Sequence, residues 1–203
     1  MRLIGIKVMS IKCRIKQVVG WIATKKYRIR HREKNLYIGK ACKIVNAENI
    51  YFKDKVEIAP YCLIASFPAR KNEGNIIFNE SVEIGMFSRI ACVKSVILGK
   101  KVFTGPGVFI SDFNHEYREI DIPINDQGVM IKKNGCGGVS IGDETWIGTG
   151  VVIAGTVTIG KHCVIGANSV VTKDIPDYCV AAGNPCKIIK RYSFETKQWE
   201  KWK

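Results

Sequence analysis

A repeat of six residues governs the C-terminal half of the chain and limits what this chain can fold into. From Ile141 the sequence reads IGDETW, IGTGVV, IAGTVT, IGKHCV and IGANSV, and each unit opens with Ile followed by Gly or Ala. An even period fits extended chain whose side chains alternate between two faces, and it does not match the 3.6-residue period of a helix. The pattern predicts short strands joined by sharp bends and stacked into a solenoid with a continuous core of Ile and Val.

A looser form of the same repeat extends upstream to Ile38. It slips by two residues after Ile44 and after Ile90, and it breaks at 66–75. Gly or Ala directly after the apolar position marks a bend where a Cβ would be crowded or φ would be unusual. We therefore expect one solenoid over residues 37–192.

The net charge of +14 is concentrated at the N-terminus. Residues 1–36 contain eleven basic residues and one acid, a net charge of +10, which leaves +4 for residues 37–203. The chain is sized for one domain. We expect a basic amphipathic segment at 1–36, a β-helix at 37–192 with an excursion loop at 111–138, and a helical tail at 193–203.

Apolar residues within 4–22 recur at spacings of three and four, which predicts an amphipathic helix. Its basic residues suit an anionic membrane surface, but the same helix could cap the open end of the solenoid. The basic charge is the only feature that would favour nucleic-acid binding, so no nucleic-acid partner is expected. No stretch approaches the roughly 18 apolar residues of a membrane span. The expected location is cytoplasmic, with peripheral contact at the inner face of the membrane through residues 1–36 as an open alternative.

The cysteine and histidine residues show no metal-binding pattern. The eight cysteines include no C-x-x-C pair, which favours free thiols in a reducing compartment. His31 lies in a basic run, and His162 occupies an outward position of its hexad. Together with His115 they have no ligand-like spacing, so no metal is expected.

The hexads resemble those of the left-handed parallel β-helix acyltransferases, and residues 78–192 are similar to the galactoside, maltose and polysaccharide O-acetyltransferase branch. The resemblance implies an all-β triangular prism with three hexapeptides per coil, a left-handed crossover, acetyl-CoA as co-substrate and a homotrimer with active sites between neighbouring prisms. With the flanking segments, the expected fold is a left-handed parallel β-helix with an N-terminal amphipathic helix and a short C-terminal helix.

The excursion loop between Ile110 and Val139 carries the chemistry that this resemblance implies. A run of some 28 residues without the repeat indicates a functional segment. In the resembling enzymes, a His placed before a signature such as GDETWIG (142–148) is the catalytic base, which here is His115. Imidazole can take a proton from a sugar hydroxyl at neutral pH and return it to the leaving thiolate.

Residues close to His115 in the sequence are candidate acceptor contacts. Asp112 and Asn114 could orient the imidazole or contact the sugar, and they could equally form Asx turns that stabilise the loop. Glu116, Tyr117 and Arg118 are further candidates for contact with the acceptor.

The resemblance also implies positions that contact acetyl-CoA, where lysines would meet its phosphates. Trp146 could instead pack between neighbouring subunits, and the tail also carries turn residues that would end the solenoid. The implied cofactor-binding residues are Trp146, Thr149, Ala167, Thr172, Lys173, Lys187 and Lys190.

The expected acceptor is a saccharide of a surface polymer such as a capsule or O-antigen, either free, nucleotide-linked or lipid-linked. Relatives acting on free galactosides or maltose carry Asn and Asp where this chain has Gly85 and Val93. Two alternatives remain open, namely a β-helical acyltransferase for serine, an antibiotic or a nucleotide-sugar amine, and a scaffold without activity.

Overall fold

The computed structural model describes residues 35–130 and 137–202. The amphipathic helix predicted within 4–22 therefore lies outside the described residues. In the described part of the chain, no helix is both long enough and apolar enough to cross a membrane.

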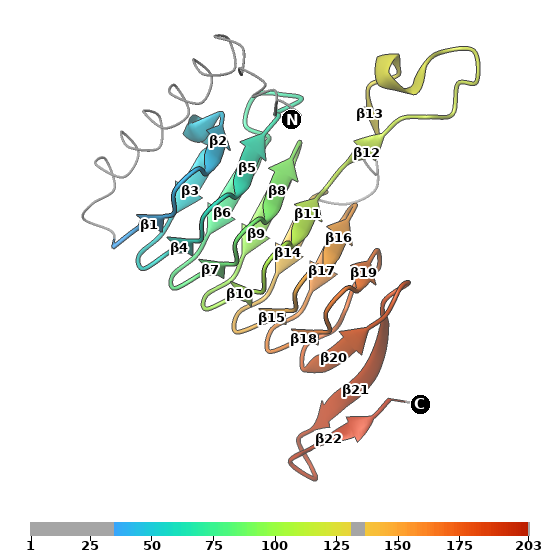
Figure 1. Cartoon of the computed structure of the whole chain (residues 1–203). Coiled ribbons are helices and arrows are strands. Elements are labelled where there is room, and N and C mark those ends of the chain that lie inside the picture. Colours follow the sequence, from blue (N-terminus) through green and yellow to red (C-terminus); the bar gives the residue numbers. More distant parts are fainter. Residues whose placement is uncertain (1–34, 131–136, 203) are drawn as a thin grey trace, which may run out of the picture.

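Three parallel sheets form the body of the molecule, and the chain visits them in a fixed order, coil after coil (Figure 1). We call them face A, face B and face C. Face A contains β1 (Tyr37–Ile38), β4 (Glu57–Ile58), β7 (Glu83–Ile84), β10 (Phe103–Thr104), β15 (Trp146–Ile147), β18 (Val164–Ile165) and β20 (Cys179–Ala182). Face B contains β2 (Lys43–Val45), β5 (Leu63–Ser66), β8 (Arg89–Cys92), β11 (Phe109–Ser111), β16 (Val152–Ala154) and β19 (Val170–Val171). Face C contains β3 (Ile50–Phe52), β6 (Asn75–Phe78), β9 (Ser95–Leu98), β14 (Val139–Ile141) and β17 (Val157–Ile159).

The register of the sheets confirms that three hexads make one coil. Ile141 pairs with Ile159, and Ile147 pairs with Ile165, so equivalent residues lie one full coil apart in the sequence. These isoleucines are almost completely buried and form continuous columns along the prism. Burial of each such side chain contributes about 1.5–3 kcal/mol, which makes the columns the main source of stability.

The bends follow from backbone crowding at the second position of each hexad. A Cβ at Gly142 would lie 2.5 Å from the backbone nitrogen of Lys161 in the next coil, and one at Gly148 would lie 2.7 Å from that of Ala167. The left-handed φ values fall instead at the fourth position, as at Glu144 (58°) and His162 (53°). The glycines are therefore required by the close approach of neighbouring coils.

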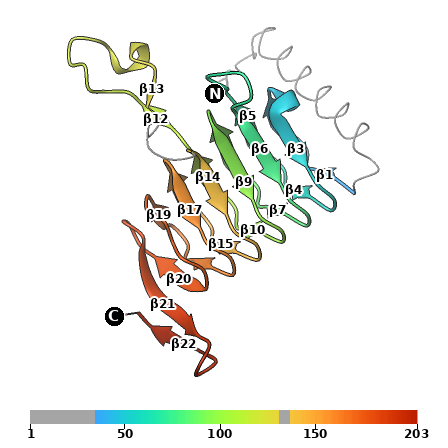
Figure 2. The same ribbon diagram turned by 180° about the vertical axis from the view of Figure 1, so that it is seen from behind.

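Every departure from the six-residue period between Ile38 and Val171 falls where the chain passes from face B to face C. We call this the B–C edge. It carries the short 3-10 helix η2 (Ala47–Asn49), the loop 67–74, the turn at 93–94 and the excursion 112–138. The excursion contains β12 (Asn114–His115), the 3-10 helix η3 (Ile124–Asp126) and β13 (Val129–Met130). Figures 1 and 2 show β12 and β13 projecting from the edge opposite the strands of face A.

The C-terminal tail is a β-hairpin, and the predicted helix at 193–203 is wrong. β21 (Lys187–Ser193) pairs antiparallel with β20 and with β22 (Gln198–Lys201). The tail is rich in β-branched and aromatic residues, which favour strands, and the aromatic side chains pack across the hairpin. The rings of Tyr192 and Trp199 lie 5.5 Å apart.

The cysteines in the described residues are free thiols, as predicted. Most of them occupy inward positions, and burial raises the pKa of Cys163 to about 11 and that of Cys92 to about 12. Because of these raised pKa values, the buried thiols stay protonated near neutral pH. A protonated thiol is unreactive and packs in the core like a small apolar side chain.

Candidate functional site

His115 lies at the base of the hairpin formed by β12 and β13. It is paired across the hairpin with Val129, and its side chain is exposed to solvent. The hairpin leaves the prism directly after β11, so the position of the imidazole depends on how firmly this base is held. The structure thus places His115 on a projecting segment of the B–C edge.

Asp112 fixes the base of the hairpin. Its side chain is buried, and its carboxylate accepts three backbone hydrogen bonds of 2.8 Å, from Val93, Lys94 and Ser95 in the preceding coil. Bonds to an ionised acceptor are roughly twice as strong as neutral ones. Asp112 therefore stabilises the base of the loop through contacts with the preceding coil and not through a local Asx turn, while Asn114 beside His115 is exposed.

Glu116 and Arg118 form an ion pair at the start of the excursion. Arg118 Nη2 donates to Glu116 Oε2 at 2.8 Å, and Arg118 Nε donates to Glu116 Oε1 at 2.9 Å. The side-chain hydrogen bonds from Arg118 are the main reason why the pKa of Glu116 is lowered. Tyr117 between them is exposed, so all three predicted acceptor contacts lie together beside His115.

Gln127 organises the rest of the excursion, a role that the sequence does not predict. Its side-chain oxygen accepts from the backbone of Glu119, and its amide nitrogen donates to the carbonyl oxygens of Glu119 and Ile122. One side chain therefore closes the tip of a loop that has no repeat. A lone Gln in a polar loop carries no sequence signal for this role.

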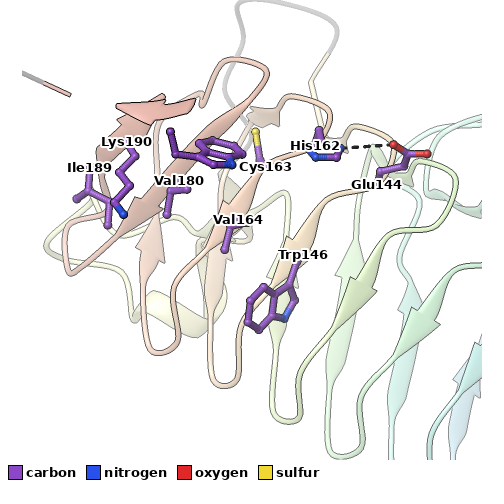
Figure 3. A pocket seen from close by; sticks show the side chains of 9 residues that line it. Glu144, Trp146, His162, Cys163, Val164, Val180, Ile189 and Lys190 are labelled. Carbon is purple, nitrogen blue, oxygen red and sulfur yellow. Dashed lines mark hydrogen bonds and ion pairs between the residues drawn. The ribbon is translucent and has the colours of Figure 1, made fainter. Parts of the chain in front are cut away.

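A groove of about 500 Å³ lies on face A (Figure 3). Trp146, Val164, Val180 and Lys190 are consecutive register partners across four strands and form its floor. The remaining lining residues are Glu144, His162, Cys163, Ile189 and Trp199. The structure thus brings together two of the predicted cofactor residues, Trp146 and Lys190, on a largely apolar surface.

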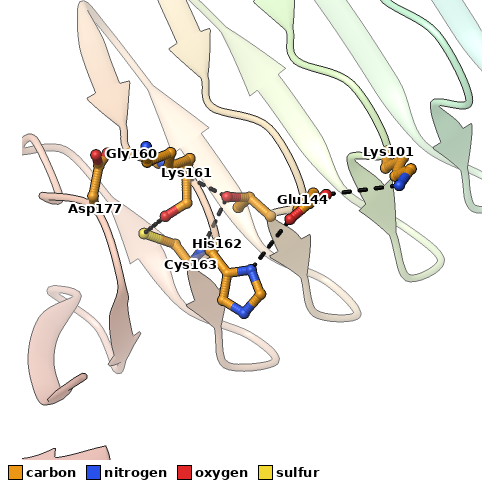
Figure 4. Close-up of polar contacts among 8 residues, drawn as sticks. Lys101, Glu144, Gly160, Lys161, His162, Cys163 and Asp177 are labelled. Carbon is orange, nitrogen blue, oxygen red and sulfur yellow. Dashed lines mark hydrogen bonds and ion pairs between the residues drawn. The ribbon is translucent and has the colours of Figure 1, made fainter. Parts of the chain in front are cut away.

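Glu144 links the coils before and after its own at the rim of this groove (Figure 4). Its carboxylate lies 3.7 Å from Lys101 Nζ and 3.5 Å from His162 Nδ1. These side chains are more than half exposed, so the pairs contribute little to stability. His162 is a surface residue, as predicted, and it also lines the groove, which the sequence analysis missed.

The other predicted cofactor residues are exposed and lie at different edges of the prism. Thr149 and Ala167 stand on neighbouring coils between faces A and B, where Asn168 N–H donates to the Thr149 carbonyl at 2.8 Å. Thr172 and Lys173 follow β19 at the B–C edge, and Lys187 begins β21. In the triangular prism the B–C edge is opposite face A. A single chain therefore keeps His115 apart from Trp146 and Lys190.

The described residues contain no group of three or more His, Cys, Asp or Glu side chains close enough to hold a metal ion. His115 and His162 lie on different parts of the prism, and His31 falls outside the described residues.

Comparison with known proteins defines the class. A family profile, bacterial transferase hexapeptide (six repeats), matches residues 138–173. AntD, an N-acyltransferase from Bacillus cereus, has the same fold, with a TM-score of 0.62 and 17% identity over 84% of this chain and 90% of AntD. The architecture is thus a left-handed parallel β-helix, as predicted. The chain thus contains the hexapeptide repeat of bacterial transferases and is similar to proteins named as acetyltransferases.

Two of the curated relatives are O-acetyltransferases by name. The Escherichia coli K12 protein "Putative lipopolysaccharide biosynthesis O-acetyl transferase WbbJ" is 37% identical over 130 residues, which cover 63% of this chain and 66% of that relative. Galactoside O-acetyltransferase of the same organism is 39% identical over 108 residues, covering 52% of this chain and 48% of the relative. The chain therefore matches less than two thirds of the length of these relatives.

Proposed function

We propose that this protein is an acetyl-CoA-dependent O-acetyltransferase that acetylates a hydroxyl of a saccharide during the synthesis of a surface polysaccharide. The observation that carries the proposal is His115, an exposed imidazole at the base of a hairpin that Asp112 anchors to the prism. The names of the relatives, which refer to lipopolysaccharide and to galactoside, support this substrate class.

His115 acts as the general base. A neutral imidazole has one ring nitrogen with a free lone pair, and this nitrogen accepts the proton of the attacking hydroxyl. The oxygen then attacks the thioester carbonyl, and the proton passes to the departing CoA thiolate. Such a base contributes about 10²–10⁴ to the rate, and correct positioning supplies much of the rest.

Acetyl-CoA lies against the regular coils. Trp146 and the apolar floor of the groove suit the pantetheine arm, and Lys190 suits the phosphates, because an ammonium group can neutralise them. Thr149, Ala167 and Lys187 extend this surface along its borders, whereas Thr172 and Lys173 belong to the B–C edge. No metal takes part in the transfer.

The active site forms between two copies of the chain in a homotrimer. Within one prism, His115 and the groove lie on opposite sides, so a ligand that touches both needs the hairpin of one copy and face A of another. A closed ring of three prisms provides three equivalent sites of this kind.

The test is a CoA-release assay with acetyl-CoA and bacterial oligosaccharides. His115→Ala should lose at least about 10²-fold in turnover, as expected for removal of a general base. Its affinity for CoA, measured by calorimetry, should not change. Lys53→Ala is the control, because this exposed side chain follows β3 and belongs neither to the hairpin nor to the groove. Wild-type turnover by His115→Ala would contradict the proposal.

Two other readings give different results in the same experiments. A scaffold without activity would bind no CoA in calorimetry. An acyltransferase for serine, an antibiotic or an amino sugar would release CoA with those acceptors and not with oligosaccharides.

A further inference from the structure

A second hollow, of about 400 Å³, lies on the B–C edge two coils before the His115 hairpin. It is formed between η2 and the loop 67–74, and none of the residues predicted for acetyl transfer lines it. Both walls belong to insertions that break the six-residue period on this edge.

The hollow is polar and has no net charge in its lining. Glu48 and Glu73 supply two carboxylates, and Arg70 and Lys71 supply two cations. Among residues 35–130 and 137–202, these four side chains make no hydrogen bond or ion pair. They are therefore available to a ligand. A balanced set of donors and acceptors fits a neutral polyhydroxylated molecule better than a diphosphate, which requires an excess of cations.

Tyr51 gives the hollow an apolar surface. Tyr51 is 48% exposed, stands on face C and lines the hollow together with Asn72 and Asn75. An exposed aromatic ring next to amide side chains offers both an apolar face and hydrogen-bonding groups. A sugar ring has the matching combination of C–H faces and peripheral hydroxyls.

The walls of the hollow are held in place by hydrogen bonds between a side chain and the backbone. Ser66 Oγ donates to the Gly74 carbonyl at 2.6 Å, and Asn46 Nδ2 donates to the Ser66 carbonyl at 2.7 Å. The loop 67–74 therefore begins and ends at fixed points. A pre-formed site of this kind binds a ligand without first having to order its own backbone.

One turn joins the hollow to the His115 hairpin. The Lys94 carbonyl accepts from the backbone N–H groups of Gly74 and Asn75, at the end of the first insertion. The Lys94 N–H donates to Asp112, at the start of the second. Two coils at the usual strand spacing place the two insertions about 10 Å apart along the prism. The turn at 93–94 between them is short, so no insertion projects from the coil that separates the two.

We propose that this hollow is a subsite for the saccharide acceptor, distinct from the position where acetyl transfer occurs. The acceptor is an oligosaccharide of at least two sugar residues that lies along the B–C edge. One residue presents its hydroxyl to His115, and another occupies the hollow against Tyr51. This inference rests on the proposed acetylation of a saccharide, and it specifies that the acceptor is longer than one sugar ring.

A glycan array tests the subsite directly. The probe is a set of capsule and O-antigen oligosaccharides of two or more residues, printed beside their single-sugar components. The full-length protein should bind at least one oligosaccharide ten-fold or more tightly than its single sugars. Tyr51→Ala combined with Asn72→Ala should reduce that binding to the level of the single sugar. Tyr37→Ala is the matched control, because Tyr37 is 53% exposed but lies on face A.

The two hypotheses fail in different ways. Binding without preference for length, no binding to the array, or equal binding by the double variant with an unchanged melting temperature would overturn the subsite. If CoA release is absent while length-dependent binding is lost in the double variant, the subsite stands and the proposed transfer reaction fails. A folding defect is recognised from the circular dichroism spectrum, and in that case the single variant Asn72→Ala decides.

Discussion

Face A and the B–C edge are built by the same coils but follow different rules. On face A the strands keep the six-residue period, so Trp146, Val164 and Val180 stand in one outward column. All the insertions that break this period lie on the B–C edge. Specific hydrogen bonds, such as those accepted by Asp112, hold the backbone there in place. The difference teaches that stacking supplies a surface, whereas an insertion supplies a side chain that can reach away from the prism.

The largest expected effect is the recovery of activity when two inactive variants, one altered in the hairpin and one on face A, assemble into the same trimer. His115→Ala alone and Trp146→Ala combined with Lys190→Ala should each be nearly inactive at low acetyl-CoA. Co-expression of the two variants with different affinity tags yields mixed trimers after tandem purification. In a cyclic trimer of mixed composition, one of the three interfaces combines an intact hairpin with an intact face A, so about one third of wild-type turnover should return.

Each variant carried through the same purification with both tags is the control for this experiment. Activity that does not return in the mixed trimers would mean that a single prism contains the whole site. That result would remove the contrast drawn between face A and the B–C edge.

The regular part of the molecule could be predicted because its rule is local. Ile141, Ile147 and Ile159 are buried at a fixed spacing along the chain. Gly142 is required because the next coil approaches its backbone closely. The buried isoleucines and the glycine therefore both leave a periodic signal in the sequence. The left-handed crossover was available only through resemblance to a family, because parallel crossovers are right-handed in about 98% of cases.

The parts that were missed depend on contacts between distant residues. Trp199 reaches the groove only because β21 and β22 extend face A antiparallel, a pairing that no local pattern specifies. The proximity of His162 to Glu144 could have been predicted, because the two residues are three hexads apart and three hexads make one coil. Gln127 and the three bonds to Asp112 could not, since insertions follow no period.

A smaller effect is expected when the anchor of the B–C edge is removed. Asp112→Ala leaves three backbone N–H groups without their acceptor, and it should lower the free energy of unfolding by about 3 kcal/mol. Chemical denaturation measures the change. Asp143→Ala is the matched control, because this exposed carboxylate accepts from Lys100 N–H at a regular bend and should cost about 1 kcal/mol or less. Equal losses in both variants would contradict a special role for the edge.

The smallest effect concerns the ion pair beside His115. Hydrogen bonds from Arg118 lower the pKa of Glu116, so the carboxylate is favoured in the folded protein. The stabilisation is therefore present above the unfolded pKa, near 4.3, and it is lost as the pH falls through the lower folded value. A carboxyl carbon NMR titration of the full chain should give a midpoint below about 4.3, and Arg118→Gln should raise it. Arg89→Gln, an exposed arginine on face B, should leave it unchanged. An unaltered midpoint in Arg118→Gln would mean that the pair does not persist in solution, and Glu116 and Arg118 would then be free to contact the acceptor separately.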